Sequence, residues 1–219
     1  TDSVGRSQLS RIIYGARVSF LIGFCATALS MLVGGALGLL AAYFGGAVNS
    51  IINVLANTML AIPALLFLLA LSIALRPSTP MLTVILSVIT VPAFLRITYA
   101  NALAEMQKDY VVAAQLMGAS TGRTMLREVL PNSIMPVLSY AVLVVPSMIV
   151  VEGSLSFLGY GVPAPQPSWG AMIAAGRARL TTNPAEALIP CAAMFLTVFA
   201  LNGIGDAIRE RYGSREGVA

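Results

Sequence analysis

Long apolar stretches, separated by shorter polar segments, dominate the hydrophobic pattern of this chain. Five of them are long enough to cross a hydrocarbon core of about 30 Å, which takes about 20 helical residues. They cover residues 18–42, 51–75, 81–104, 134–151 and 186–205. Because lipid offers the backbone no hydrogen-bond partners, each stretch is predicted to be helical. The expected fold class is all-α, a polytopic transmembrane helical bundle.

Composition supports a membrane protein: 58% of the residues are hydrophobic and 10% are charged, whereas a soluble domain carries about 25% charged residues. The net charge of +4 does not indicate a nucleic-acid partner, because the basic residues are spread over loops and helix ends. We interpret the group Arg209, Arg211 and Arg215 as a cytoplasmic flank of the last span. The lipid bilayer is therefore the predicted environment, with no nucleic acid as partner.

Small and polar side chains inside the spans have two interpretations. Gly34 and Gly38 are four residues apart and share a helix face, as do Asn53 and Asn57. Helix packing explains both pairs through close contact and interhelical hydrogen bonds, and a substrate pathway is the alternative. Arg96 can reach the cytoplasmic interface with its long side chain.

Prolines and cysteines add local expectations. Pro63, Pro92 and Pro146 each interrupt a span and predict kinks. Cys25 and Cys191 lie inside predicted spans, where we expect small buried thiols and no disulfide framework.

Two connections are long, and the single span between them puts them on opposite faces of the membrane. The positive charges do not set the orientation, since their numbers on the two sides are almost equal. The other connections, 43–50 and 76–80, are tight turns rich in glycine or proline. Any function of the loops therefore has to be sought in residues 105–133 and 152–185.

The first long connection is predicted to form two short helices around a glycine. The first runs from about Glu105 to Met117, Gly118 ends it, and Ser120 caps the next helix, residues 121–130. That second helix is amphipathic, with one apolar face and a polar face of Arg123, Arg127 and Glu128. The apolar face consists of Met125, Leu126, Val129 and Leu130. Pro131 is expected to stop the helix, and Asn132 or Ser133 to cap the following span.

A patch without bulky side chains lies on this connection, at Ala113, Ala114 and Gly118. Another protein surface could approach the backbone closely there, which predicts a docking surface. The alternative is an amphipathic hairpin that lies on the lipid headgroups.

The spacing of this patch resembles the cytoplasmic coupling loop in permease subunits of binding-protein-dependent ABC importers. That family has Glu-Ala-Ala, three residues, Gly, nine residues, Ile, any residue and Leu-Pro. Ala113, Ala114, Gly118, Leu130 and Pro131 match it in register. The chain departs from the pattern by Val112 in place of Glu and by Glu128 in place of Ile.

Five segments, one of which contains the first part of this motif, extend the resemblance to nearly the whole chain and point to the C-type subunit of peptide/nickel permeases. They are "LSRIIYGARVSF" (9–20), "GLLAAYFGG" (38–46), "LAIP" (60–63), "DYVVAAQLMGAS" (109–120) and "LSFLGYGVPAPQPSWGAM" (155–172). The resemblance implies a type I ABC importer permease fold with six spans and cytoplasmic ends, hence one more span upstream of Thr1. A single permease domain, 1–219, is expected. Its parts would be an external segment 1–17, the cytoplasmic coupling loop 105–133, an external loop 152–185 and a cytoplasmic tail 206–219.

The resemblance also implies a function. The chain would be a multi-pass subunit of the cytoplasmic (inner) membrane that imports di- or oligopeptides by alternating access, coupled through residues 105–131. Its expected partners are a homologous second permease subunit, two ATPase subunits or domains, and an extracytoplasmic solute-binding protein. No cofactor is expected in this chain, since ATP and Mg²⁺ would be bound by the ATPases.

The external loop offers a second candidate site. Phe157, Tyr160 and Trp169 can seat it at the membrane interface, while Pro163 and neighbouring prolines stiffen it. It is either a gate rim that faces the binding protein or an inert anchored loop.

Other functions remain open alternatives. Nickel or another small solute could be the cargo, and a transport-free membrane scaffold is also conceivable. An ion-gradient-driven secondary transporter would be expected to hold acidic residues or histidine in the membrane, but here the acidic residues lie in loops or at span ends. Catalytic and metal-binding residues are not expected: the chain contains no histidine, and "GASTGRT" (118–124) lacks the lysine and the spacing of a phosphate loop.

Overall fold

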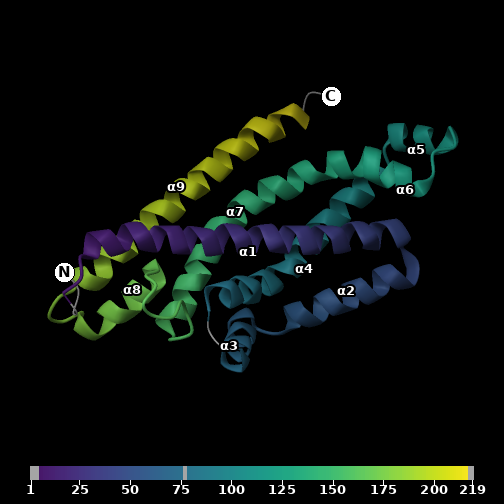
Figure 1. The fold of residues 1–219 in the computed structure, drawn as a ribbon. Coiled ribbons are helices and arrows are strands. Elements are labelled where there is room, and N and C mark those ends of the chain that lie inside the picture. The colour runs from purple at the N-terminus through teal and green to yellow at the C-terminus, as the bar shows by residue number, and fades with distance from the viewer. Residues whose placement is uncertain (1–4, 76–77, 217–219) are drawn as a thin grey trace. The chain divides into compact units, whose positions relative to one another are not determined.

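A computed structural model describes residues 5–75 and 78–216, with the side chains of residues 210–216 excepted. Its elements, in chain order, are helical (Figure 1). They are α1 (Gln8–Phe44), α2 (Gly46–Ala61), α3 (Ala64–Ala74), α4 (Thr79–Met106), α5 (Asp109–Leu116), α6 (Thr121–Thr124), the π-helical turn η1 (Met125–Val129), α7 (Leu130–Phe157), α8 (Trp169–Gly176), the 3₁₀ turn η2 (Arg177–Arg179) and α9 (Ala185–Glu216).

The predicted spans correspond to helices of the structure. Four helical segments are long and apolar enough to cross a membrane: α1, α4, Thr121–Phe157 and Ala185–Arg209. Helices α2 and α3 form a fifth candidate, bent by 91° at the break between them. Pro63 lies at this break, and Ile62 before it is extended, as a residue preceding proline prefers. Pro92 lies inside α4 and Pro146 inside α7, and both helices continue through them.

The chain divides into two compact units, and α1, α4 and α7 contribute residues to both. The first unit comprises Thr1–Thr27, Leu65–Ser87 and Val142–Ala219. In its core, Trp169 of α8 packs with Val145 and Ile149 of α7. The Trp169 indole nitrogen donates a hydrogen bond of 3.0 Å to the carbonyl of Ile12, which ties α8 to α1.

The second unit comprises Ala28–Ala64 and Val88–Ala141. Here α1 and α4 approach through glycine. A Cβ atom added to Gly34 would lie 2.5 Å from the Val91 carbonyl oxygen, and one added to Gly38 would lie 2.6 Å from that of Leu95. Helix packing is thus confirmed as the role of this glycine pair.

The segment after α4 differs from its prediction. Helix α4 extends to Met106, so the short helix α5 begins at Asp109 and not at Glu105. Pro131 does not stop a helix, since Thr121–Phe157 is one continuous helical segment. The π-turn η1 precedes Pro131, and such a wide turn gives room to a residue that lacks an amide donor.

The predicted caps of the following span are also wrong, because Asn132 and Ser133 lie inside α7. Their side chains bond the carbonyl oxygens of the preceding turn: Asn132 Nδ2 donates to Glu128 at 2.7 Å and Ser133 Oγ to Leu130 at 3.3 Å.

Helices reach into segments that were expected to be loops. Helix α1 begins at Gln8, and α9 continues to Glu216 through most of the predicted tail 206–219. Cys25 and Cys191 are free thiols and are exposed on the described chain, contrary to the expected burial. Part of the predicted turn 76–80, with Arg76, lies outside the described residues.

Candidate functional site

The connection between the third and fourth spans forms a helical hairpin of α5 and α6–η1 (Figure 1). Gly118 ends α5 with a φ of 89°, a left-handed conformation that favours glycine. Its amide donates to Gln115 and that of Ala119 to Ala114, the two hydrogen bonds of a Schellman motif. Ser120 occupies the N-cap position of α6 as predicted, but its side chain makes no capping bond.

The predicted docking residues lie on one side of this corner. Ala113 and Gly118 are exposed and Ala114 is half-buried. Bulky apolar side chains surround them: Leu116 is 84% and Met117 83% exposed. Exposed apolar side chains in such a group indicate a surface that is covered by a partner or by lipid.

Buried side chains hold the hairpin against the ends of α1 and α4. Val111, Met125 and Val129 pack into one core cluster with Ala42 and Ala102. Burying each large apolar side chain contributes about 1.5–3 kcal/mol. Leu126 does not belong to this face, because it is 66% exposed. The hairpin is therefore fixed to the helices that precede it.

A polar contact joins the hairpin to α4 and to α7. The Tyr110 hydroxyl donates to the Glu105 carboxylate of α4 and accepts from Asn132 Nδ2 of α7 at 3.0 Å. Partial burial, then the hydrogen bond and the charge of Glu105, raise the pKa of Tyr110 to about 12. Tyr110 thus remains protonated and able to donate throughout the physiological pH range. Lys108 pairs with the same carboxylate at 3.2 Å.

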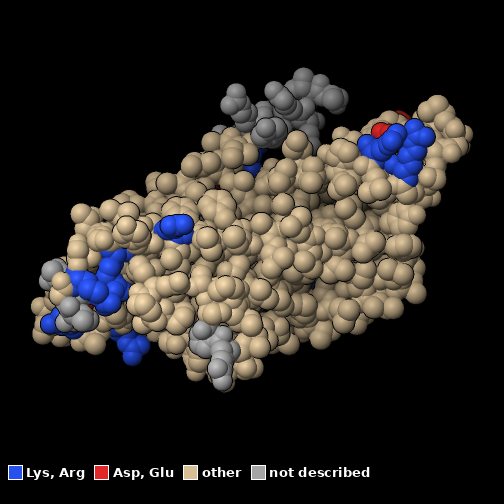
Figure 2. Space-filling model, viewed as in Figure 1, with Lys and Arg blue, Asp and Glu red and all other residues tan. Residues whose placement is uncertain are grey.

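Charge is sparse on the face of the molecule that Figure 2 shows, and one group of charged side chains lies over α5 and α6. Arg123 and Arg127 are exposed there. The exposure of these two arginines agrees with the polar face that was predicted for the second helix of the hairpin. Such exposed charges suit a surface in contact with water or with a polar partner.

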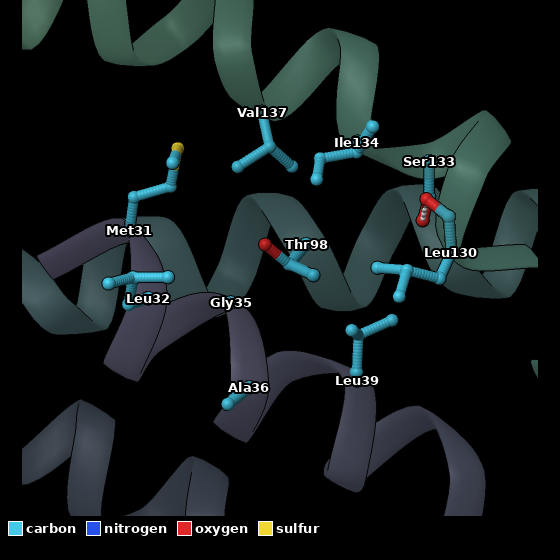
Figure 3. A pocket seen from close by; sticks show the side chains of 10 residues that line it. All are labelled: Met31, Leu32, Gly35, Ala36, Leu39, Thr98, Leu130, Ser133, Ile134 and Val137. Atoms are coloured by element: carbon cyan, nitrogen blue, oxygen red, sulfur yellow. Dashed lines mark hydrogen bonds between the residues drawn. The ribbon is translucent and has the colours of Figure 1, made fainter. Parts of the chain in front are cut away.

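Leu130 and Pro131, the last two motif residues, lie at the base of the hairpin. Leu130 lines a cavity of about 230 Å³ between α1, α4 and α7, where its side chain points inward (Figure 3). Thr98 also lines it, and among the described residues its hydroxyl oxygen has no hydrogen-bond partner. Pro131 is exposed. The motif therefore combines an exposed part with a residue that packs inward.

The second candidate site, around the loop 152–185, contains a buried cluster of one carboxylate and three serines that the sequence did not reveal. The Glu152 carboxylate of α7 is 1% exposed and accepts hydrogen bonds from three serine hydroxyls. Ser156 donates at 2.8 Å, Ser168 at 2.9 Å and Ser19 of α1 at 3.4 Å. The only sequence signal was the four-residue spacing of Glu152 and Ser156, which puts both on one helix face.

The predicted loop residues differ in exposure. Phe157 is 41% exposed and lies 5.2 Å from the Arg177 guanidinium, and Pro163 is exposed. Tyr160 is half-buried. Trp169 is only 3% exposed, so it packs in a core and does not seat the loop at the membrane interface.

A family model decides the assignment of the chain. Residues 34–216 match the family "Binding-protein-dependent transport system inner membrane component". The chain belongs to this family. It is therefore a multi-pass membrane permease subunit, and the resemblance seen in the coupling motif and the five segments is confirmed.

Curated relatives match almost the whole of this permease, which spans about two thirds of their own length. The di/tripeptide transport system permease protein DppC of Pseudomonas aeruginosa is 38% identical over 96% of this chain and 69% of its own length. The glutathione transport system permease protein GsiD of Pectobacterium atrosepticum is 34% identical over 95% and 69%.

Solved structures confirm the expected type I ABC importer permease fold. A chain of the MetNI methionine ABC transporter, in an inward-facing conformation, matches with a TM-score of 0.73 and 16% identity, over 91% of this permease and 95% of that chain. A chain of an amino acid ABC transporter matches with a TM-score of 0.71 and 14% identity, over 93% and 94%.

Proposed function

We propose that this permease subunit imports di- or oligopeptides across the cytoplasmic membrane by alternating access. Its family and the relatives named for di/tripeptide, dipeptide and glutathione transport support this proposal. Nickel or another small solute is the alternative cargo. An ion-gradient-driven carrier is not favoured, because the relatives are subunits of binding-protein-dependent systems.

The subunit itself is non-catalytic in this proposal. Two ATPase subunits or domains bind ATP and Mg²⁺, a second permease subunit completes the membrane part, and an extracytoplasmic binding protein delivers the solute. Closure of the ATPase pair moves the hairpin and shifts the helices between outward-open and inward-open states.

The observation that carries the proposal is an exposed corner with small residues at Ala113 and Gly118, on a firmly anchored hairpin. Ala113 and Gly118 leave the backbone open to close approach. The buried residues Val111, Met125 and Val129 attach that corner to α1 and α4. A displacement of the corner by an ATPase is therefore transmitted to the spans and is not lost in a loose loop.

The test is solute uptake, measured beside co-purification of the ATPase, in variants of the corner. A side chain at Gly118 has room within this chain, since a Cβ there meets nothing within 4 Å. Gly118→Asp adds backbone strain at φ 89° and places a charge in the ATPase contact. We expect uptake to fall at least tenfold, because a buried unpaired charge costs several kcal/mol, while membrane insertion is retained.

Two further variants complete the test. Ala113→Leu is expected to cause a weaker form of the same defect through steric exclusion alone. Arg123→Ala is the matched control on the polar face of the hairpin, where an exposed charge contributes about 0–1 kcal/mol, and should leave uptake nearly unchanged. If Gly118→Asp retains both the ATPase and full uptake, the hairpin lies on the headgroups and is not the coupling element.

A further inference from the structure

Arg96 is a positive charge deep within a membrane-spanning helix. It lies ten residues before Met106, the end of α4, which corresponds to about 15 Å of helix. Because the 28 residues of α4 span about 42 Å, more than a hydrocarbon core of about 30 Å, Arg96 lies about 5 Å from the middle of the helix. An ionisable side chain at this depth is rare and marks a polar contact or an aqueous path.

Among the described residues, the amide of Asn57 holds the Arg96 guanidinium group. Arg96 Nη2 donates to Asn57 Oδ1 of α2 at 2.6 Å, so the side chain is bound to a neighbouring helix and does not extend freely to the interface. Asn57 is eleven residues from Gly46, the start of α2, or about 16 Å along the helix. Both partners therefore lie at a similar depth.

Within the part of the chain that the structure describes, the positive charge of Arg96 has no counter-charge. The ion pairs Lys108–Glu105 and Arg179–Glu186 do not include it. In the described part of the same unit, the acidic residues are Glu105, Asp109 and Glu128, in or beside the hairpin. An anionic group from outside this chain would complete the site.

Helix α2 has two contrasting faces at this position. Asn49, Asn53 and Asn57 recur every four residues and therefore share one face. The Asn53 amide donates to the Asn49 carbonyl at 2.9 Å. On the other side, Ile51 and Leu55 are 61% and 62% exposed. The apolar side suits lipid, whereas the asparagine side suits water or a polar solute.

We propose that Arg96 and the asparagine face of α2 line the translocation path and bind the carboxylate of the passing solute. A guanidinium group presents paired N–H donors that match the two oxygens of a carboxylate, and the Asn57 amide orients it. A peptide always offers a terminal carboxylate, so the site fits the cargo class. This inference rests on the proposed import function and adds to it a place where the anionic end is held during transit.

The test measures how thiol reagents of opposite charge reach the asparagine face. In the intact membrane complex, Cys25 and Cys191 are replaced by serine, and Asn53→Cys serves as the reporter. Leu55→Cys on the opposite face of α2 is the matched control. The probes are the anionic sulfonatoethyl and the cationic trimethylammonioethyl methanethiosulfonates, with rates normalised to those of a free thiol in solution.

We expect the reporter at position 53 to react and the control at 55 to remain unreactive. The anionic reagent should react about tenfold faster than the cationic one after normalisation, owing to attraction by the nearby charge. Arg96→Gln should abolish this preference, and Arg96→Lys should retain most of it. An unreactive reporter would mean that lipid or another subunit covers the face, and a reactive reporter without charge preference would refute the carboxylate site.

Uptake of dialanine separates this inference from the proposed function. Arg96→Gln should lower uptake about tenfold, with Arg96→Lys less affected, while the ATPase still co-purifies. Normal dialanine uptake by Arg96→Gln would also overturn the inference. If the unmodified complex does not import dialanine, the peptide assignment fails, but the thiol measurement still decides whether the face is aqueous and anion-selective.

Discussion

At the scale of single residues, two neighbouring glycines of α1 differ in the space around them. A Cβ on Gly34 would lie 2.5 Å from the Val91 carbonyl oxygen and 2.8 Å from Phe94 Cβ. One on Gly35 would meet only Thr98 Oγ1, at 3.7 Å, an ordinary contact. Both positions are glycines of the same helix. Alanine at each position therefore compares a site of close contact between α1 and α4 with a site that has room for a Cβ atom.

We expect Gly34→Ala to destabilise the protein by about 1–3 kcal/mol, the usual cost of overpacking. Gly35→Ala should be neutral or stabilising by about 0.5 kcal/mol, because alanine favours the helix. Thermal unfolding of the purified complex in detergent measures both. Equal melting temperatures for the two variants would show that α1 and α4 do not pack through Gly34.

At the scale of elements, Glu152 joins three helices of the first unit. Its carboxylate binds hydroxyls from α1, from α7 itself and from the N-cap of α8. The Ser168 hydroxyl also accepts from the Ala171 amide, so the cluster continues into the first turn of α8. Removing the carboxylate would leave these buried hydroxyl groups without the acceptor for their O–H protons.

Glu152→Ala should therefore destabilise the first unit by about 3 kcal/mol or more. Hydrogen exchange of α8 and the melting temperature of the complex measure the effect. Ser154→Ala is the control: Ser154 is exposed on the same helix and bonds only the Val150 carbonyl, so it should change stability by less than about 0.5 kcal/mol. Unchanged protection of α8 in Glu152→Ala would contradict the role of the cluster.

At the scale of the whole molecule, a single span separates the two long connections. We therefore expect these connections to lie on opposite sides of the membrane. Ser120 in the hairpin and Gln166 in the loop 152–185 are both exposed. In a background without Cys25 and Cys191, Ser120→Cys should react with an impermeant thiol reagent only after the membrane is opened. Gln166→Cys should react in intact spheroplasts. The reverse pattern would invert the orientation and contradict the cytoplasmic coupling loop.

The sequence by itself determined four of the five predicted spans, the position of the hairpin and the glycine that ends α5, whereas the predicted span 51–75 is a helix pair bent by 91°. These features depend on local signals: hydrophobic length, helix periodicity and the left-handed preference of Gly118. The motif residues Ala113, Ala114 and Gly118 also fall on one corner, as their close spacing predicts.

Only the tertiary structure decided which side chains face a neighbour. Trp169 is buried because α1 and α7 pack around it, and Leu126 is exposed because the buried side of its helix is formed by Met125 and Val129. The helix continues through Pro131 because a π-turn accommodates it. The Glu152 cluster and the Arg96–Asn57 bond join residues that are far apart in the chain, and local periodicity carries no information about such partners.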